Sequence, residues 1–185
     1  MKKKKFVFGM GCGCCGTASL ALLLNSQDNA LVSHEMQPIL PWDTKQGKGI
    51  MQYKYGQLDH QGHLFDLVGD VGCYYLPYIG FLMKSLNEVS VLKQGYDFKF
   101  IIMKREKAKV VESFLKKFKR QNNNPLQNHG NEKIKVDEWD KSFPKYDNMS
   151  PREAIEKYYD DYYKIADVFE ERHPDNVKIF DIAYL

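Results

Sequence analysis

The chain has 185 residues, of which 43% are hydrophobic, 14% aromatic and 28% charged. This length predicts a single domain, 1–185, and the apolar content is sufficient for a buried core, which excludes a disordered or fibrous protein. Lys and Arg number 27 against 24 Asp and Glu, and the net charge of +3 is too small to indicate a nucleic-acid-binding protein.

The N-terminus outwardly resembles a signal peptide or a membrane anchor, because the lysines at 2–5 precede an uncharged stretch at 6–24. Glycines within residues 9–16 oppose this interpretation, since each costs about 1 kcal/mol in a helix. No later segment approaches the roughly 18 apolar residues that a spanning helix needs. We expect no membrane span, and the cysteines crowded at 12–15 favour reduced thiols in the cytoplasm over a disulfide framework.

Alternating strand and helix signals run through the first half of the chain. Short apolar runs predict strands at 6–8, 30–33 and 63–71, whereas the segments 17–25 and 74–86 have a helical composition. The first strand is followed at once by a glycine-rich loop, which then leads into the first helix.

The second half continues the same alternation. Residues 98–103 (FKFIIM) predict a buried strand, and a helix at 105–120 follows it directly. A Ser-Pro-Arg-Glu start signal at 150–153 predicts a long helix to about residue 173, before a final strand at 176–182. Repeated strand and helix units predict a three-layer α/β fold, a mostly parallel sheet flanked by helices with right-handed crossovers.

The segment between the last two predicted helices differs in composition. Residues 121–149 are rich in Asn, Pro, Gly and charged side chains, which predicts a long surface excursion. Excursions of this kind often shape a binding site, and a boundary between two domains is the less favoured interpretation.

Residues 11–17 (GCGCCGT) have the spacing of a phosphate-binding loop, G-x-x-x-x-G-T, without its usual Lys. Glycines allow backbone N–H groups to converge on an anion, the positive end of the following helix adds to this, and Thr17 supplies a hydroxyl. The loop therefore predicts a phosphate or phosphosulfate site. The alternative is a tight strand-to-helix turn that merely needs small residues.

The same loop contains a second motif, C-x-x-C, formed by Cys12 and Cys15. At a helix start this motif also fits a thiol oxidoreductase, because the helix end lowers the pKa of a thiol there. The chain lacks a clear cis-Pro segment and the later layout of such proteins. A zinc site using Cys73 and a histidine is weaker still, because no second paired-ligand motif is present, and we expect no metal.

Two separated motifs resemble the family of sulfotransferases that use 3′-phosphoadenosine 5′-phosphosulfate (PAPS). FVFGMGCGCCGTASLALLLN at 6–25 is similar to the family's 5′-phosphosulfate loop, and FIIMKREKAKVVESF at 100–114 resembles its 3′-phosphate motif, a strand ending in Arg with a Ser eight positions later. The resemblance implies a P-loop-like nucleotide-binding fold that takes PAPS as donor and releases PAP. It also implies donor contacts from Gly11, Gly13, Cys14, Cys15, Gly16, Thr17, Ala18, Arg105 and Ser113.

Local charge agrees with the second motif. Arg105 follows a predicted strand, at the edge where open α/β sheets bind ligands. Residues 93–120 contain ten Lys or Arg and three acidic residues, which suits a phosphate, although a solvated helix face explains much of this charge.

The chain departs from the family at Cys14, where the family usually has Lys or Arg to neutralise the leaving phosphate. A neutral thiol cannot supply that charge, whose contribution is typically several kcal/mol. The family's proline after the Arg is also absent, since Glu106 stands there. A catalytically weak or purely nucleotide-binding protein is therefore an alternative. A P-loop kinase fits less well, because the loop lacks Lys and no magnesium-binding acidic strand end is evident.

Sulfuryl transfer needs a base for the proton of the acceptor, a hydroxyl or amine of a carbohydrate or small metabolite. Glu35 and His34 follow the second predicted strand, and a Glu in this region is the base in some relatives, so we favour Glu35 slightly. A purely structural role for this pair in a loop is the alternative. Asp70 and Trp42 are further candidates for the acceptor site, although Trp is more often part of a core.

Overall fold

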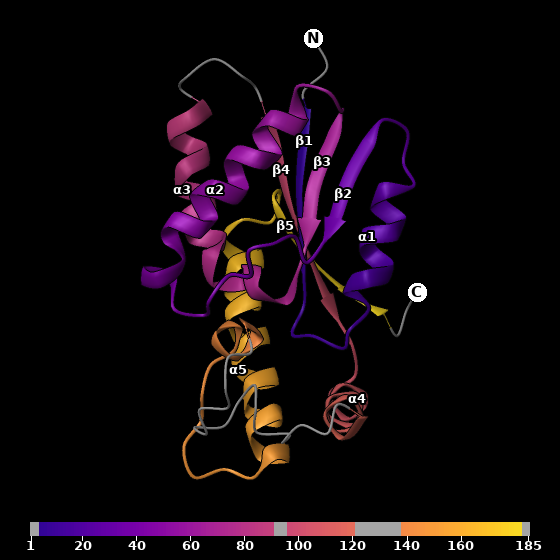
Figure 1. Cartoon of the computed structure of the whole chain (residues 1–185), viewed down its shortest axis with the longest axis vertical. Helices are drawn as coiled ribbons and strands as arrows, with labels where there is room; N and C mark the ends of the chain where they lie inside the picture. The colour runs from indigo at the N-terminus through magenta and orange to yellow at the C-terminus, as the bar shows by residue number, and fades with distance from the viewer. Residues whose placement is uncertain (1–3, 91–95, 121–137, 183–185) are drawn as a thin grey trace.

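The computed structural model describes residues 4–90, 96–120 and 138–182. Its strands form one parallel sheet in the order β2-β3-β1-β4-β5 (Figure 1), which confirms the predicted α/β fold with a parallel sheet. The strands are β1 (Lys4–Met10), β2 (Ala30–His34), β3 (Leu67–Val71), β4 (Tyr96–Lys104) and β5 (Val177–Asp181).

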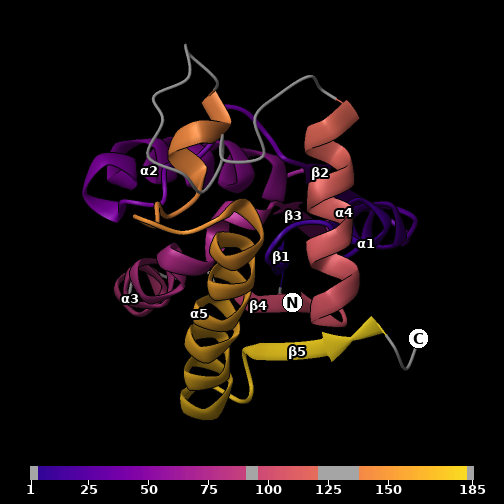
Figure 2. The same ribbon diagram turned by 90° about the horizontal axis from the view of Figure 1, so that it is seen from below.

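Helices cover both faces of the sheet, so that the molecule has three layers. Figure 2 shows α1 on one face and α2, α3 and α5 on the other, whereas α4 lies below the carboxyl ends of the strands in Figure 1 and packs against α5. The helices are α1 (Thr17–Asn25), α2 (Thr44–Gly62), α3 (Ile79–Ser90), α4 (Lys107–Arg120) and α5 (Pro151–Arg172), with short 3-10 helices η1 (Cys73–Tyr78) and η2 (Glu138–Ser142).

The core lies along the central strands, where aromatic side chains of neighbouring strands stack. The rings of Phe6 and Phe98 are 4.9 Å apart, and those of Phe8 and Phe100 are 5.7 Å apart. All four side chains are buried. Because helices cover both faces, these strands are continuous apolar runs, which is why the sequence identified β1 and β4 clearly.

Helix α2 has no counterpart among the predicted elements. Its glycines obscure the helical pattern, but one of them is required by packing: a Cβ on Gly47 would overlap the hydroxyl of Tyr78 in η1. Asp43 caps the helix by accepting a hydrogen bond from the Lys45 N–H at 2.9 Å. Tertiary contact thus overrides the low helix propensity of this segment.

Two other predicted elements have different bounds in the structure. The strand expected at 63–71 begins only at residue 67, and the helix expected at 74–86 is divided into η1, which contains Pro77, and α3. The predicted start of α5 is confirmed, because Ser150 and Glu153 form a reciprocal capping box with Pro at the first helical position.

The surface excursion predicted at 121–149 is described only in part, since 121–137 lie outside the described residues. The remainder packs on the core. Phe143 is buried, and its ring makes edge contacts with Phe114 and Tyr158 at centroid distances of 6.2 and 5.6 Å. This part of the segment therefore joins α4 to α5.

The order of the strands reverses between the two central strands β1 and β4. β1 and β4 are neighbours, but the chain continues from β1 to β2 at one edge of the sheet and from β4 to β5 at the opposite edge. Open α/β sheets bind ligands at such a reversal of strand order. The loop at 11–16 follows β1 and Arg105 follows β4, so both begin at this reversal.

Candidate anion-binding site

The loop between β1 and α1 has a tightly turned backbone. Gly13 and Gly16 have φ values of 95° and 88°, and Cys14 between them also has a positive φ of 53°. A Cβ on Gly13 would lie 2.7 Å from Cζ of Phe114, whereas a Cβ on Gly16 would meet no atom within 4 Å. The glycines therefore allow both the left-handed conformation and a close approach to α4.

The first turn of α1 presents backbone donors. Gly16 is the N-cap, no side chain caps the helix, and its first turn contains no acidic residue. Within the described residues, the N–H groups of Thr17, Ala18 and Ser19 have no hydrogen-bond acceptor. Free amides together with the positive end of the helix make this turn suitable for an anion.

Arg105 joins this loop to the basic helix α4. Its Nη1 donates to the carbonyl oxygen of Cys14 at 3.0 Å and to Oγ of Ser113 at 3.3 Å. The carbonyl oxygen of Arg105 accepts a hydrogen bond from Tyr159 at 2.7 Å, which anchors the residue to α5. The two motifs that the sequence analysis paired thus meet in space, on one side of the molecule.

The inner side of the loop is occupied by sulfur. Cys12 and Cys15 are both fully buried, and all four cysteines are free thiols. A hydrogen bond from Cys12 and the backbone N–H groups of Gly13 and Cys15 lower the pKa of Cys15, whereas burial raises the pKa of Cys12. Neither sulfur can meet a disulfide of another protein without opening the loop, so this geometry disfavours thiol exchange.

Cys14 brings no positive charge to the loop. Its side chain is half-buried, and burial raises the pKa of its thiol, which opposes ionisation. The positive charges of Lys117 and Arg105 act in the opposite direction on the same thiol. Two cations therefore lie within electrostatic range of the Cys14 side chain.

Lys117 is a charged residue near this loop that the sequence analysis did not single out. It lies exposed on α4, and its positive charge partly offsets the rise in pKa that burial causes at both Cys14 and Glu35. A signal was present, because Lys117 is four residues after Ser113 and residues at this spacing share one face of a helix.

Glu35 and His34 reach the same site from the end of β2. The Nε2 atom of His34 lies 3.3 Å from Oγ1 of Thr17 and 3.8 Å from Oε1 of Glu35. The two side chains are 33% and 31% exposed, so a substrate can reach them. Burial raises the pKa of Glu35, partly offset by His34 and Lys117, which moves the carboxylate toward the range of a general base.

Backbone strain gathers at this site. The described residues with positive φ other than glycine are Cys14, Asn29, Glu35 and Asn148. Asn tolerates this conformation well, but Cys and Glu adopt it rarely. The two unusual cases belong to the loop and to the neighbouring strand end, a distribution typical of functional sites.

Asp70 and Trp42, the further candidates for the acceptor site, both make contacts within the protein. Asp70 is fully buried and accepts hydrogen bonds from the Met36 N–H and from two tyrosine hydroxyls. Trp42 is half-buried and packs on α5, with its ring 5.7 Å from that of Tyr158. Their polar and aromatic groups are thus committed within the protein.

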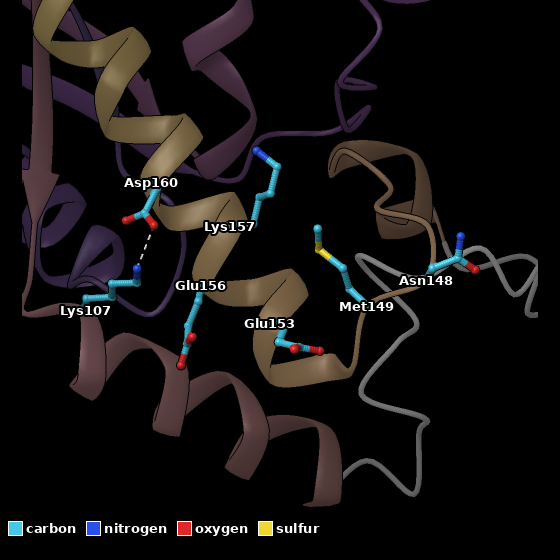
Figure 3. A pocket seen from close by; sticks show the side chains of 7 residues that line it. All are labelled: Lys107, Asn148, Met149, Glu153, Glu156, Lys157 and Asp160. Atoms are coloured by element: carbon cyan, nitrogen blue, oxygen red, sulfur yellow. Dashed lines mark hydrogen bonds and ion pairs between the residues drawn. The ribbon is translucent and has the colours of Figure 1, made fainter.

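A separate pocket of about 480 Å³ lies between the start of α4 and the first half of α5 (Figure 3). Lys107 pairs with Asp160 across it at 2.7 Å, and none of the residues predicted to bind PAPS lines it.

In the described parts of the chain, no cluster of His, Cys, Asp or Glu is arranged to hold a metal ion. None of the helices described there is long and apolar enough to cross a membrane.

Comparison with known proteins provides no assignment: no protein-family model matches the chain, and no curated protein matches it significantly. Function is therefore proposed from the residues and the geometry of this site.

Proposed function

We propose that the protein is a PAPS-dependent sulfotransferase with a P-loop-like fold, which transfers a sulfuryl group to a hydroxyl or amine of a carbohydrate or small metabolite. The observation that carries this proposal is the contact of Arg105 with both Cys14 and Ser113. This contact joins a loop suited to one phosphate with a basic helix suited to another. The free thiols favour a cytoplasmic location.

In this proposal PAPS binds across the carboxyl ends of the neighbouring strands β1 and β4. The free N–H groups of Thr17 and Ala18, together with the hydroxyl of Thr17, hold the 5′-phosphosulfate at the start of α1. Arg105 and Ser113 hold the 3′-phosphate. A guanidinium has five N–H donors, so Arg105 can keep its contact with the loop while it binds a phosphate.

The transfer itself places the acceptor beside Glu35. The carboxylate accepts the proton of the acceptor hydroxyl as the new S–O bond forms, and the bond between sulfur and the bridging oxygen breaks to release PAP. Lys117 supplies the positive charge that Cys14 cannot, by lying near the leaving phosphate. Positioning and charge stabilisation provide most of the rate.

The neutral thiol of Cys14 favours a second candidate, a catalytically weak protein that binds the nucleotide. Such a protein binds PAP but transfers no sulfate. The thiol oxidoreductase has less support, because the sulfurs of Cys12 and Cys15 are buried.

Calorimetric titration with PAP tests the proposal. Arg105→Ala should weaken binding by roughly 100-fold, because hydrogen bonds from a charged group contribute about 1.5–3 kcal/mol each. Lys109→Ala is the matched control, since this nearby lysine is 61% exposed and pairs only with Glu106 among the described residues, at 3.0 Å. It should change the affinity less than twofold. A wild-type protein without PAP affinity, or equal affinities for the two variants, would contradict the nucleotide site.

Transfer is measured separately, with labelled PAPS and a panel of sugars, phenols and amines. Lys117→Met should reduce turnover roughly tenfold or more, and Cys14→Arg should raise it, because each changes the positive charge beside the leaving group. If PAP binds but neither the wild type nor Cys14→Arg labels an acceptor, the binding-only candidate is the better description.

A further inference from the structure

A buried polar cluster lies beneath the proposed base, between α2, β3 and η1. Lys54 and Asp70 are both 0% exposed, and Nζ of Lys54 lies 3.7 Å from Oδ2 of Asp70. The Lys54 ammonium also lies over the ring of Tyr74, 5.1 Å from its centroid. Charged residues are almost never fully buried unless they are paired, and here each charge compensates the burial of the other.

The cluster holds both backbone polar groups of Met36. The Met36 N–H donates to Oδ1 and Oδ2 of Asp70 at 3.1 and 3.2 Å. The Met36 carbonyl oxygen accepts a hydrogen bond from Nζ of Lys54 and lies 3.2 Å from the hydroxyl of Tyr74. This peptide segment is therefore fixed by buried side chains from three elements.

Met36 directly follows Glu35, whose backbone is in the left-handed region with a φ of 55°. The N–H of Glu35 donates to the carbonyl oxygen of Val71 at 2.9 Å. The peptide groups before and after Glu35 are thus both tied to the end of β3. A strained backbone conformation persists only where the surrounding structure holds it in this manner.

We propose that Lys54, Asp70 and Tyr74 are positioning residues that hold Glu35 toward the anion-binding loop. The inference rests on the proposed role of Glu35 as the base. A buried ion pair is weak evidence for stability by itself, because apolar residues of similar volume often stabilise as well. Because the Lys54 and Asp70 pair contacts both backbone polar groups of Met36, its role in this proposal is to orient the neighbouring carboxylate of Glu35.

Two adjacent tyrosines provide a matched pair of variants. Both side chains are fully buried. The Tyr75 hydroxyl donates to Oδ2 of Asp70 at 2.6 Å, whereas the single proton of the Tyr74 hydroxyl is shared between Oδ2 of Asp70 and the carbonyl oxygen of Met36, each 3.2 Å away. Only the Tyr74 hydroxyl also contacts the Met36 carbonyl oxygen. Tyr74→Phe therefore tests positioning, and Tyr75→Phe controls for the loss of a hydroxyl from the same carboxylate.

The readout is the ¹³C NMR titration of the Glu35 carboxyl group in the protein without substrate. Tyr74→Phe should move its pKa toward the ordinary Glu value, because the side chain is released from the environment that raises it. The charged groups acting on Glu35 from the neighbouring elements are His34, Lys117 and Asp70, and this variant leaves all three in place. Tyr75→Phe should leave the titration unchanged, although it removes the shorter hydrogen bond.

Turnover and nucleotide binding complete the test. Tyr74→Phe should lower sulfate transfer roughly tenfold or more at unchanged PAP affinity, whereas Tyr75→Phe should change both less than twofold. Lys54→Met removes the other hydrogen-bond donor to the Met36 carbonyl oxygen and should lower sulfate transfer in the same way. This variant replaces Tyr74→Phe in the test if Tyr74→Phe does not fold. Equal effects of the two tyrosine variants on the Glu35 titration would overturn the positioning role. Failure of the wild type to bind PAP would instead contradict the proposed function, and the titration would still decide the role of Tyr74.

Discussion

The carboxyl ends of β1 and β3 are neighbours in the sheet, but they differ in whether their polar groups have hydrogen-bond partners inside the protein. At the end of β1, the first amides of α1 have no acceptor within the described residues, and half-buried Arg105 lies beside them. At the end of β3, buried Asp70 is surrounded by donors from α2, η1 and the chain after β2. The first region keeps its hydrogen-bonding capacity for a ligand, whereas the second uses it internally.

This difference shows that a charged residue at the ligand-binding edge of a sheet is not in itself a ligand contact. Burial and the number of partners separate the two cases, because a group whose hydrogen bonds are all made inside the protein has none left for a substrate. Asp70 and Arg105 occupy comparable positions at strand ends, and only Arg105 remains available.

The largest expected effect concerns the stability of the β3 end. Asp70→Asn should lower the free energy of unfolding by about 3–5 kcal/mol, because it leaves the Lys54 ammonium buried without its counter-charge. Asp97→Asn is the matched control: its carboxylate pairs with Lys99 at 3.1 Å, both side chains are partly exposed, and the expected loss is at most about 1 kcal/mol. Urea denaturation measures both, and similar losses would remove the distinction between the regions.

A second effect follows from the pKa of Lys54, which burial lowers to about 8 from an ordinary value of 10.5, partly offset by Asp70. Between these two pH values the unfolded chain binds more protons than the folded chain, so stability rises with pH. Below pH 8 both states are protonated, and the cost of the buried charge is fully present.

The wild type should therefore gain up to about 3 kcal/mol relative to Lys54→Met between pH 8 and 10.5. Burial also raises the pKa values of Tyr74 and Tyr75, so these neighbours do not titrate in the same range. Urea denaturation across this pH range provides the measurement, and a constant difference between the two proteins would show that the Lys54 proton is not involved.

The smallest effects are expected in the loop after β1. Gly13→Ala should cost about 2–3 kcal/mol, because the φ of 95° is unfavourable for Ala and the new Cβ would lie 2.7 Å from Phe114. Gly16→Ala should cost only about 1 kcal/mol, since its φ of 88° is similar but no atom lies within 4 Å of the new Cβ. If thermal or urea unfolding ranks the variants in the reverse order, close packing against α4 is not what requires Gly13.

Local signals in the sequence were sufficient for most of the fold. Apolar runs predicted the strands, and the Ser150 and Glu153 pair predicted the start of α5, because strand burial and helix capping depend on residues close together in the chain. The parallel sheet follows from the alternation of strands and helices. Since carboxyl ends of parallel strands meet at one edge, the approach of Arg105 to the loop could also be predicted.

The tertiary structure decided what depends on residues distant in sequence. The sequence did not predict helix α2, because a glycine such as Gly47 disfavours a helix and its packing against Tyr78 is a contact between residues distant in sequence. Lys54 has the sequence character of a surface lysine, and only the docking of α2 on β3 buries it beside Asp70. Residue type and spacing determined which groups could carry charge to the site, whereas folding decided which of them are neutralised inside the protein and which stay available.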